Sequence, residues 1–207
     1  MSFLLSLMVF LAAPVTPPAS SAEEADKTTI LVAYYSETGN TESLAKAIVE
    51  GISSVPSAEP VLRNVSEVKD EDIRKADGIL VGTPVQWGGL SARAKDFVDR
   101  VGRVLGEGEG QHGEGRTAGA FCTGGAVASG KGLARMAILA AFMNMRFVAV
   151  GGLLADGFGS LGAEATTGPA APGLSERELD EARLAGERFA RITREVRKAR
   201  RWPLAQH

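Results

Sequence analysis

The sequence contains little cysteine and histidine, with one cysteine and two histidines among 207 residues. The single cysteine, Cys122, has no second cysteine with which to form an internal disulfide. These few residues are also too few for the usual His/Cys zinc site. Disulfide-stapled scaffolds and zinc enzymes of that kind are therefore excluded, and we predict no metal site.

The sequence also lacks an excess of charge of either sign. It has 23 Lys and Arg against 25 Asp and Glu, which gives a formal net charge of -2. A strongly basic surface is what nucleic-acid binding requires, so we expect no nucleic-acid partner. The length and an apolar fraction of 44% are those of one ordinary globular domain.

Charged side chains are missing from the first part of the chain, between Ser2 and Ala22. The apolar run Phe3–Ala13 has the length of the hydrophobic segment of a signal peptide and is too short to span a bilayer. Three prolines follow, and then a small-residue pattern typical of cleavage sites. We expect residues 1–22 to be a signal peptide or a disordered leader, and 23–207 to be the single domain. Export to the periplasm or the exterior follows from the first interpretation, and a cytoplasmic protein from the second.

Short apolar runs alternate with stretches of helical periodicity in the remainder of the chain. The runs that predict buried strands are Thr28–Tyr35, Val61–Val65, Gly78–Val85, Arg116–Thr123 and Phe147–Gly152. Apolar stripes such as Ala94, Phe97 and Val98 indicate amphipathic helices between them. Strands that alternate with helices in this way predict βαβ units and a parallel sheet. The fold class is therefore α/β, a three-layer sandwich around a five-stranded parallel sheet.

Ligands of such sheets bind at the carboxyl ends of the strands, so the loops that follow the strands are candidate sites. The loop after the first strand combines hydroxyls, a glycine and a helix start, which suits one terminal phosphate. It has no lysine of the kind that a nucleoside triphosphate loop needs. A plain helix cap and turn is the alternative interpretation. The candidate residues of this loop are Ser36, Glu37, Thr38, Gly39, Asn40 and Thr41.

Two further loops follow the third and fourth predicted strands. The first of these has a proline, two glycines and Trp87, whose indole offers a wide face for a planar ring. The second is built of small residues that leave room for the edge of a flat ligand. The candidate residues in the two loops are Thr83, Pro84, Val85, Gln86, Trp87, Gly88, Gly89, Leu90, Thr123, Gly124 and Gly125.

Several of these segments together resemble one known family. The S-x-T-G-N-T loop is similar to the phosphate loop of flavodoxin-like proteins, and G-T-P-V-Q-W-G-G-L resembles the flavin-ring loop of NAD(P)H:quinone oxidoreductases of the WrbA type. Phe158–Gly162 and Gly173–Phe189 resemble the C-terminal segment of that family. The resemblance covers about residues 28–195 in chain order, which is more specific than any one glycine loop.

The resemblance implies a flavodoxin-like sheet of strand order 2-1-3-4-5 that binds FMN at the residues named above. It further implies two-electron hydride transfer from NAD(P)H through the flavin to a quinone, without a catalytic acid or base, in a homodimer or homotetramer. The loop for one terminal phosphate and the absence of a GxGxxG motif favour FMN over FAD. Gln86 stands where the family carries an arginine. A flavodoxin-type electron carrier and a non-catalytic flavin-binding module are the alternative functions.

Overall fold

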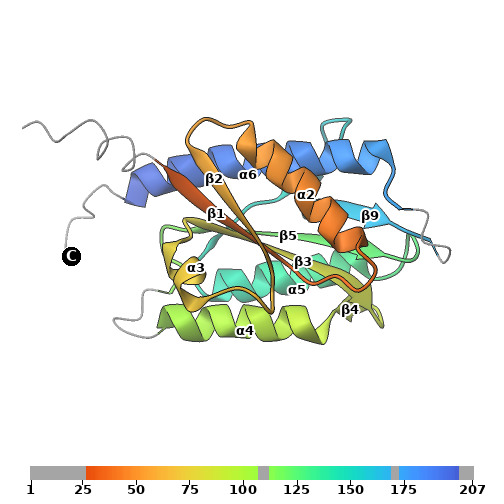
Figure 1. Ribbon diagram of the computed structural model, residues 1–207, viewed down its shortest axis with the longest axis horizontal. Helices are drawn as coiled ribbons and strands as arrows, with labels where there is room; N and C mark the ends of the chain where they lie inside the picture. The colour runs from red at the N-terminus through yellow and green to blue at the C-terminus, as the bar shows by residue number, and fades with distance from the viewer. Residues whose placement is uncertain (1–26, 107–111, 169–172, 201–207) are drawn as a thin grey trace, which may run out of the picture.

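The computed structural model describes residues 27–106, 112–168 and 173–200 as one α/β sandwich (Figure 1). The parallel strands run in the order β2-β1-β3-β5-β6, and β9 also pairs with β5. The strands are β1 (Thr28–Tyr34), β2 (Ala58–Asn64), β3 (Gly78–Gln86), β5 (Thr117–Gly124), β6 (Val148–Ala149) and β9 (Glu164–Thr166). This order confirms the predicted 2-1-3-4-5 arrangement of five parallel strands. The predicted leader, residues 1–22, lies outside the described residues.

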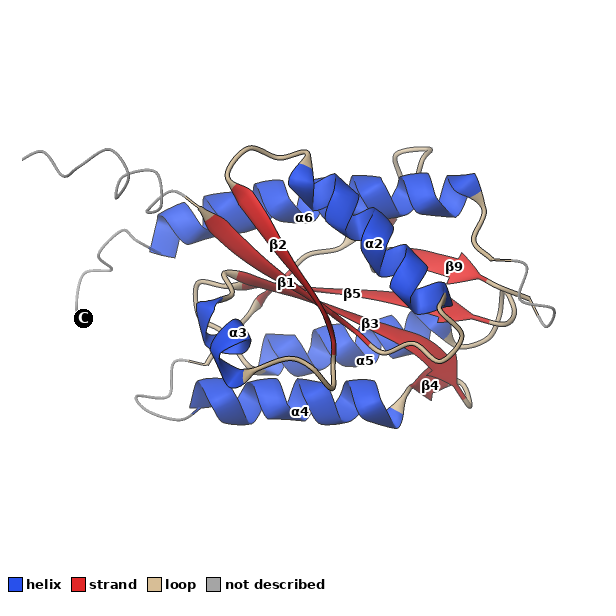
Figure 2. Cartoon of the chain, in the orientation of Figure 1, coloured by secondary structure: helices blue, strands red, loops and turns tan. Residues whose placement is uncertain are grey.

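Helices cover both faces of the sheet, as Figure 2 shows. The helices are α2 (Asn40–Ser53), α3 (Asp70–Lys75), α4 (Ala92–Gly106), α5 (Lys131–Asn144) and α6 (Glu176–Arg200). Ile30 and Val32 of β1 point into the core beneath α2 and α6, whereas Leu31 and Ala33 point into the core beneath α3, α4 and α5. This alternation is why the sheet strands are apolar at nearly every position.

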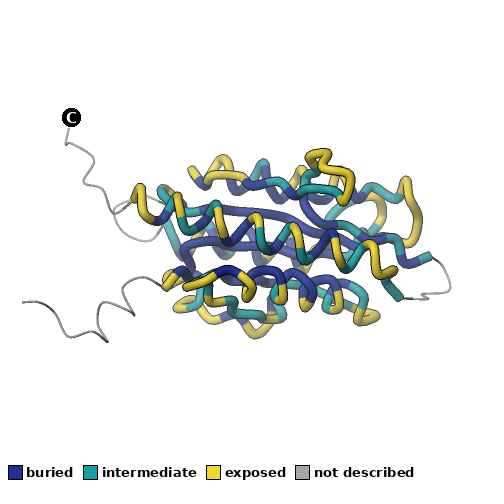
Figure 3. Tube along the Cα trace, turned by 90° about the horizontal axis from the view of Figure 1, so that it is seen from above, coloured by how far each residue is buried: buried dark blue, intermediate teal, exposed yellow. Residues whose placement is uncertain are grey.

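The burial pattern follows the layers (Figure 3). All eight residues of β5, which lies between β3 and the short strands β6 and β9, are buried, and the helices expose one side to solvent. No helix in the described ranges is long and apolar enough to cross a membrane.

The fifth strand differs from the prediction. We predicted one strand over Phe147–Gly152, but only Val148–Ala149 pairs with β5 before the chain leaves the sheet. The chain then forms a hairpin of β7 (Gly152–Leu153) and β8 (Gly159–Ser160), and it returns to the sheet as β9, which pairs with Cys122–Gly124 of β5. The return passes close to β5, since a Cβ on Gly162 would lie 1.8 Å from the Ala120 carbonyl oxygen. The β7–β8 hairpin is therefore a segment inserted into the fifth strand, which it divides into two short halves, β6 and β9.

Candidate functional site

Three loops meet at the carboxyl edge of the sheet: the β1–α2 loop, the β3–β4 hairpin and the β5–α5 loop. Strand β4 (Gly89–Leu90) pairs antiparallel with the end of β3. The Gln86 side-chain amide donates to Glu37 Oε1 at 2.7 Å, which joins the first loop to the hairpin. A Cβ on Gly130 would lie 2.2 Å from the Gly88 carbonyl oxygen, so the hairpin and the β5–α5 loop are in backbone contact. The sequence-predicted residues are thus brought together in one place.

The β1–α2 loop presents the amino terminus of a 14-residue helix without a side-chain cap. Gly39 takes the cap position with φ 84°, a left-handed conformation that glycine adopts without strain. Space in front of it is open, because a Cβ there would meet nothing within 4 Å. The Ser36 hydroxyl accepts from the Gly39 N–H at 3.1 Å and fixes the turn. Free helix N–H groups and a partial positive charge suit a single anion here.

The three hydroxyls of this loop do not all face the same way. Thr38 is exposed, and its hydroxyl accepts from the Asn40 side-chain amide at 3.0 Å. Thr41 is only 1% exposed, and its hydroxyl lies 2.8 Å from that of Thr123 at the end of β5. Thr41 and Thr123 therefore tie α2 to the sheet, whereas Ser36 and Thr38 remain near the surface.

The β3–β4 hairpin displays Trp87 at its tip. Gln86 pairs with Gly89, which leaves Trp87 and Gly88 as a two-residue turn with φ values of 50° and 84°. Positive φ at both positions is the pattern of a type I′ hairpin turn, which favours Asn-Gly. A bulky residue in this conformation is strained, and the indole is fully exposed. Trp87 therefore combines backbone strain with exposure of a large apolar surface.

The base of the hairpin is held by buried hydroxyls. The Thr83 hydroxyl lies 3.0 Å from the Ser91 hydroxyl and accepts from the Ser91 N–H at 3.0 Å. The Ser91 hydroxyl in turn accepts from the Ala94 N–H in the first turn of α4. Thr83 thus supports the loop, and the neighbouring Pro84, Val85 and Leu90 are half-buried.

The β5–α5 loop contributes small residues and one unpaired buried hydroxyl. Gly124 is buried, whereas Gly125 is exposed with open space around it. The Ser129 hydroxyl oxygen is buried and has no hydrogen-bond partner. Buried polar atoms are normally satisfied, so this oxygen is a candidate to bind a ligand in the site. Within the described residues of the three loops, Glu37 is the sole charged side chain.

An ionic cluster that the sequence analysis missed lies beside the β5–α5 loop. Glu164 of β9 pairs with both Lys131 and Arg135 of α5, whose side chains are only 5% and 7% exposed. The Lys131 ammonium lies 2.9 Å from Glu164 Oε1. The cluster forms one wall of a cavity of about 630 Å³ that Val127 of the β5–α5 loop also borders. Glu164 is far in sequence from the two cations of α5, and only the return of β9 to the sheet brings it beside them.

The same cavity is bordered by Glu178 near the start of α6. Its carboxylate accepts from the backbone N–H groups of Thr166, at 2.7 Å, and Ser175, at 2.8 Å. Burial raises the pKa of Glu178, but these hydrogen bonds and the Lys131 charge outweigh it and the pKa is lowered on balance. Glu178 is therefore a charged anchor between β9 and α6.

Cys122 is fully buried in β5, where it packs as a small apolar residue. Burial raises the pKa of its thiol to about 11, despite the nearby Arg135 and Lys131. At pH 8 the folded protein is therefore expected to resist iodoacetamide, and urea-unfolded protein is expected to be alkylated at this one cysteine. Mass spectrometry after timed labelling measures both. Rapid alkylation of the folded protein would contradict the buried placement of Cys122.

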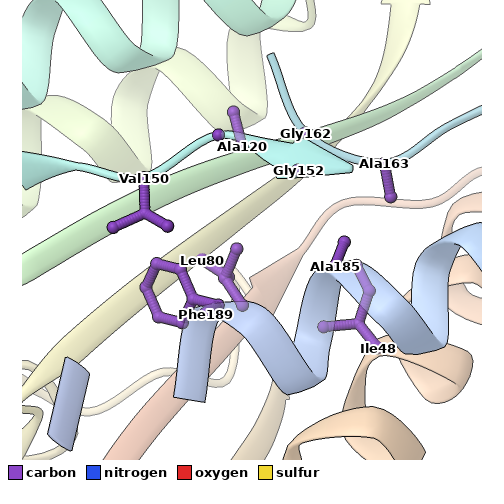
Figure 4. Close-up of a pocket in the computed structure, with 10 residues that line it drawn as sticks. Ile48, Leu80, Ala120, Val150, Gly152, Gly162, Ala163, Ala185 and Phe189 are labelled. Carbon is purple, nitrogen blue, oxygen red and sulfur yellow. The ribbon is translucent and has the colours of Figure 1, made fainter. Parts of the chain in front are cut away.

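A second cavity lies inside the core between β5, the inserted segment and α6 (Figure 4). Its volume is about 10 Å³, and Leu80, Val150 and Phe189 are among its mainly apolar lining residues. This space is about that of one water molecule. It is a packing void and not a cofactor site.

Comparison with known proteins agrees with this geometry. The family described as NADPH-dependent FMN reductase matches residues 27–159. A flavodoxin of Aquifex aeolicus is 37% identical over 123 residues, which cover 59% of this chain and 64% of that flavodoxin. The match thus spans just under two thirds of that relative. An NAD(P)H dehydrogenase (quinone) of Solidesulfovibrio magneticus is 26% identical, with 81% of this chain and 98% of the relative covered.

Among solved structures, the WrbA-like flavodoxin of Agrobacterium tumefaciens superposes with a TM-score of 0.66 at 21% identity. The superposition covers 82% of this chain and 99% of that one, and it confirms the flavodoxin-like fold. The family match includes the β1–α2 loop, the hairpin and the β5–α5 loop. The chain is therefore an oxidoreductase with FMN as cofactor and NAD(P)H as co-substrate, and it belongs to the NADPH-dependent FMN reductase family.

Proposed function

We propose that the protein is an FMN-dependent NAD(P)H:quinone oxidoreductase whose three loops hold the flavin. The FMN phosphate would lie at the uncapped amino terminus of α2, near the hydroxyls of Ser36 and Thr38. The isoalloxazine ring would lie between Trp87 and the small residues of the β5–α5 loop. The open space at Gly39 and Gly125 and the unpaired Ser129 hydroxyl support this fit.

The conformation of Trp87 carries the proposal. A type I′ turn with Trp at its first central position is strained, and strain of this kind costs about 1–3 kcal/mol. The exposed indole adds nothing to the core that would offset that cost. A residue held in this way is explained by a ligand that covers it, and a flat aromatic ring is the ligand that an indole face suits best.

The reaction transfers two electrons from NAD(P)H to the quinone and consumes one proton for each quinol formed. FMN supplies the hydride acceptor and donor, and the protein supplies orientation and exclusion of competing reactions. The three loops contain no histidine, lysine or arginine, so we assign no general acid or base to them. Glu37, held by Gln86 and by the Tyr35 hydroxyl at 3.0 Å, joins the first loop to the hairpin beside the ring.

The test is turnover of the FMN-loaded protein under anaerobic conditions. Addition of NADPH is expected to bleach the visible flavin band, and excess benzoquinone is expected to restore it. With both substrates in excess, many equivalents of NADPH should be consumed per flavin. A protein that binds FMN without consuming NADPH would contradict the enzyme proposal.

The second candidate is a flavodoxin-type electron carrier, which the 37% identity to an Aquifex aeolicus flavodoxin favours. Such a carrier would accept electrons from a reduced protein partner and not from NADPH. Its docking would be expected to use an acidic surface, which a net charge of -2 does not provide. The benzoquinone assay separates the two functions, because only the reductase consumes NADPH without a second protein.

We also propose that residues 1–22 direct export. The mature protein is then expected to begin at Glu23 and to appear outside the cytoplasm. Replacement of Leu5 and Leu7 by Arg should retain the uncleaved chain inside the cell, whereas replacement of both by Ala should not. Amino-terminal sequencing of fractionated protein measures this, and an intact Met1 on cytoplasmic wild-type protein would contradict export.

A further inference from the structure

The three loops carry no positive charge with which to hold an anionic co-substrate. NAD(P)H is negatively charged at its pyrophosphate, and NADPH is also negatively charged at its 2′-phosphate. Within the described residues of the three loops, Glu37 is the sole charged side chain, and the FMN phosphate would add negative charge at the start of α2. Like charges repel across a shared site, so a cation close to the loops is needed to hold the co-substrate.

Several cations next to the loops are already paired with carboxylates. Lys131 and Arg135 of α5 are buried beside Glu164. On α4, which follows the β3–β4 hairpin, the Lys95 ammonium lies 2.5 Å from Asp99 Oδ1. A cation that is held by a carboxylate of the protein gains less from the phosphate of a ligand, because its charge is already partly balanced.

Arg93, in the first turn of α4, differs from these cations. It is exposed, and it forms no ion pair with any residue of 27–106, 112–168 or 173–200. The first turn of α4 also contains no acidic residue. The helix dipole disfavours a cation at this position, so Arg93 does not contribute to the stability of α4. Its guanidinium is available to an anion from solution.

Contacts on two sides place Arg93 at the rim of the three-loop site. Ser91, two residues earlier, is buried and bonded to Thr83 at the base of the hairpin, and Figure 1 shows β4 beside the start of α4. On the other side lies Tyr35, whose hydroxyl donates to Glu37 at 3.0 Å. This hydrogen bond is the main cause of the raised pKa of Tyr35, and the nearby charge of Arg93 acts in the opposite direction.

We propose that Arg93 binds a phosphate group of NAD(P)H at the rim of the three-loop site. The inference rests on the proposed function, which places the flavin at these loops. A guanidinium can donate two parallel hydrogen bonds to one phosphate, and its long side chain can reach a ligand outside the loops. The pyrophosphate, which NADH and NADPH share, and the 2′-phosphate, which only NADPH has, offer the same chemistry to Arg93.

The opposite charges of Arg93 and Glu37 would orient the co-substrate. The nicotinamide must stack on the flavin ring to transfer its hydride, and the rest of the molecule must then leave the ring in one direction. Attraction by Arg93 and repulsion by Glu37 both favour the path over the first turn of α4. The binding of the phosphate therefore helps to select the orientation of the nicotinamide.

The test compares Arg93→Gln with the wild-type protein, both loaded with FMN. The KM for NADPH is expected to rise about tenfold, since one hydrogen bond to a charged group is worth about that factor in affinity. The Kd of NADP+, measured by calorimetry without turnover, should rise by a similar factor. An equal rise for NADH and NAD+ assigns the pyrophosphate to Arg93, whereas unchanged values for them assign the 2′-phosphate.

Matched variants separate a contact from a general effect of charge. Arg103→Gln removes the same charge from an exposed position about three turns further along α4, and it should change KM and Kd by less than about twofold. Arg93→Lys keeps the charge and should recover much of the lost affinity. An increase in salt from about 50 mM to about 500 mM should weaken NADP+ binding more in the wild-type protein than in Arg93→Gln.

The outcomes for this inference and for the proposed function are distinguishable. Wild-type turnover with the same KM and Kd in Arg93→Gln would overturn the role of Arg93 and leave the proposed function standing. Equal weakening by Arg93→Gln and Arg103→Gln would also overturn that role. A wild-type protein without turnover whose NADP+ affinity still depends on Arg93 would support the phosphate contact and contradict the proposed function. Absence of both turnover and nucleotide binding would overturn both.

Discussion

Replacing Trp87 by Asn is expected to stabilise the FMN-free protein and to lower the affinity of the protein for FMN. Asn tolerates the left-handed conformation at position 87, and Asn-Gly is the preferred type I′ pair. The free energy of unfolding should rise by about 1 kcal/mol. Loss of the stacked indole should weaken FMN about threefold to tenfold, since such contacts are worth about 0.5–1.5 kcal/mol. The fluorescence of the flavin that remains bound should increase.

Phe158→Asn is the matched control for this prediction. Phe158 is also an exposed aromatic residue, at 74%, but it lies outside the three loops and has no positive φ. Neither stability nor FMN affinity should change by more than about 0.5 kcal/mol. Urea unfolding of the FMN-free proteins and flavin titration measure both effects. If Trp87→Asn destabilises the protein and leaves FMN affinity unchanged, the hairpin does not line the flavin.

Glu164→Ala is expected to cost about 3–5 kcal/mol of stability. Removal of this carboxylate takes the paired counter-charge from two buried cations, Lys131 and Arg135, and leaves Lys131 only the attraction of Glu178. Buried charges that lose their partner are strongly destabilising. The loss should appear as a lower urea midpoint followed by circular dichroism. Glu164→Gln should cost less, because its amide oxygen still accepts a hydrogen bond.

Glu59→Ala is the control for the ionic cluster. Glu59 pairs with Lys27 at 3.8 Å, with both side chains about half exposed. Surface pairs of this kind contribute about 0–1 kcal/mol, so the change should be small. Equal effects of Glu164→Ala and Glu59→Ala would show that the buried cations do not depend on Glu164.

The parallel sheet was predictable because its strands are short, apolar and separated by amphipathic helices, whereas the order of the strands was predicted from the resemblance to flavodoxin-like proteins. The consecutive apolar residues of β1 directly predict its burial on both faces; they are Ile30, Leu31, Val32 and Ala33. The position of the site was predictable for a related reason, since parallel strands place their following loops at one edge. Contacts such as Gln86 with Glu37 agree with that expectation.

Other features depend on contacts that local pattern does not encode. The apolar run that follows Arg146 has the pattern of a complete strand. The sequence therefore did not predict that the chain leaves the sheet after Val150 and that β9 completes the pairing with β5. Thr41 and Ser36 look alike in the loop sequence, yet only Thr41 is turned inward, by its bond to Thr123. The positive φ of Trp87 follows from the register of Gln86 with Gly89, which the local sequence does not encode.

The most direct test of the three-loop site is titration of the FMN-free protein with FMN and with riboflavin, with flavin emission as the signal. The account predicts strong quenching by the Trp87 indole and binding of FMN at least tenfold tighter than riboflavin. The phosphate would gain hydrogen bonds worth roughly 1.5–3 kcal/mol each at the start of α2. Equal affinity for the two flavins, or emission unchanged on binding, would contradict it.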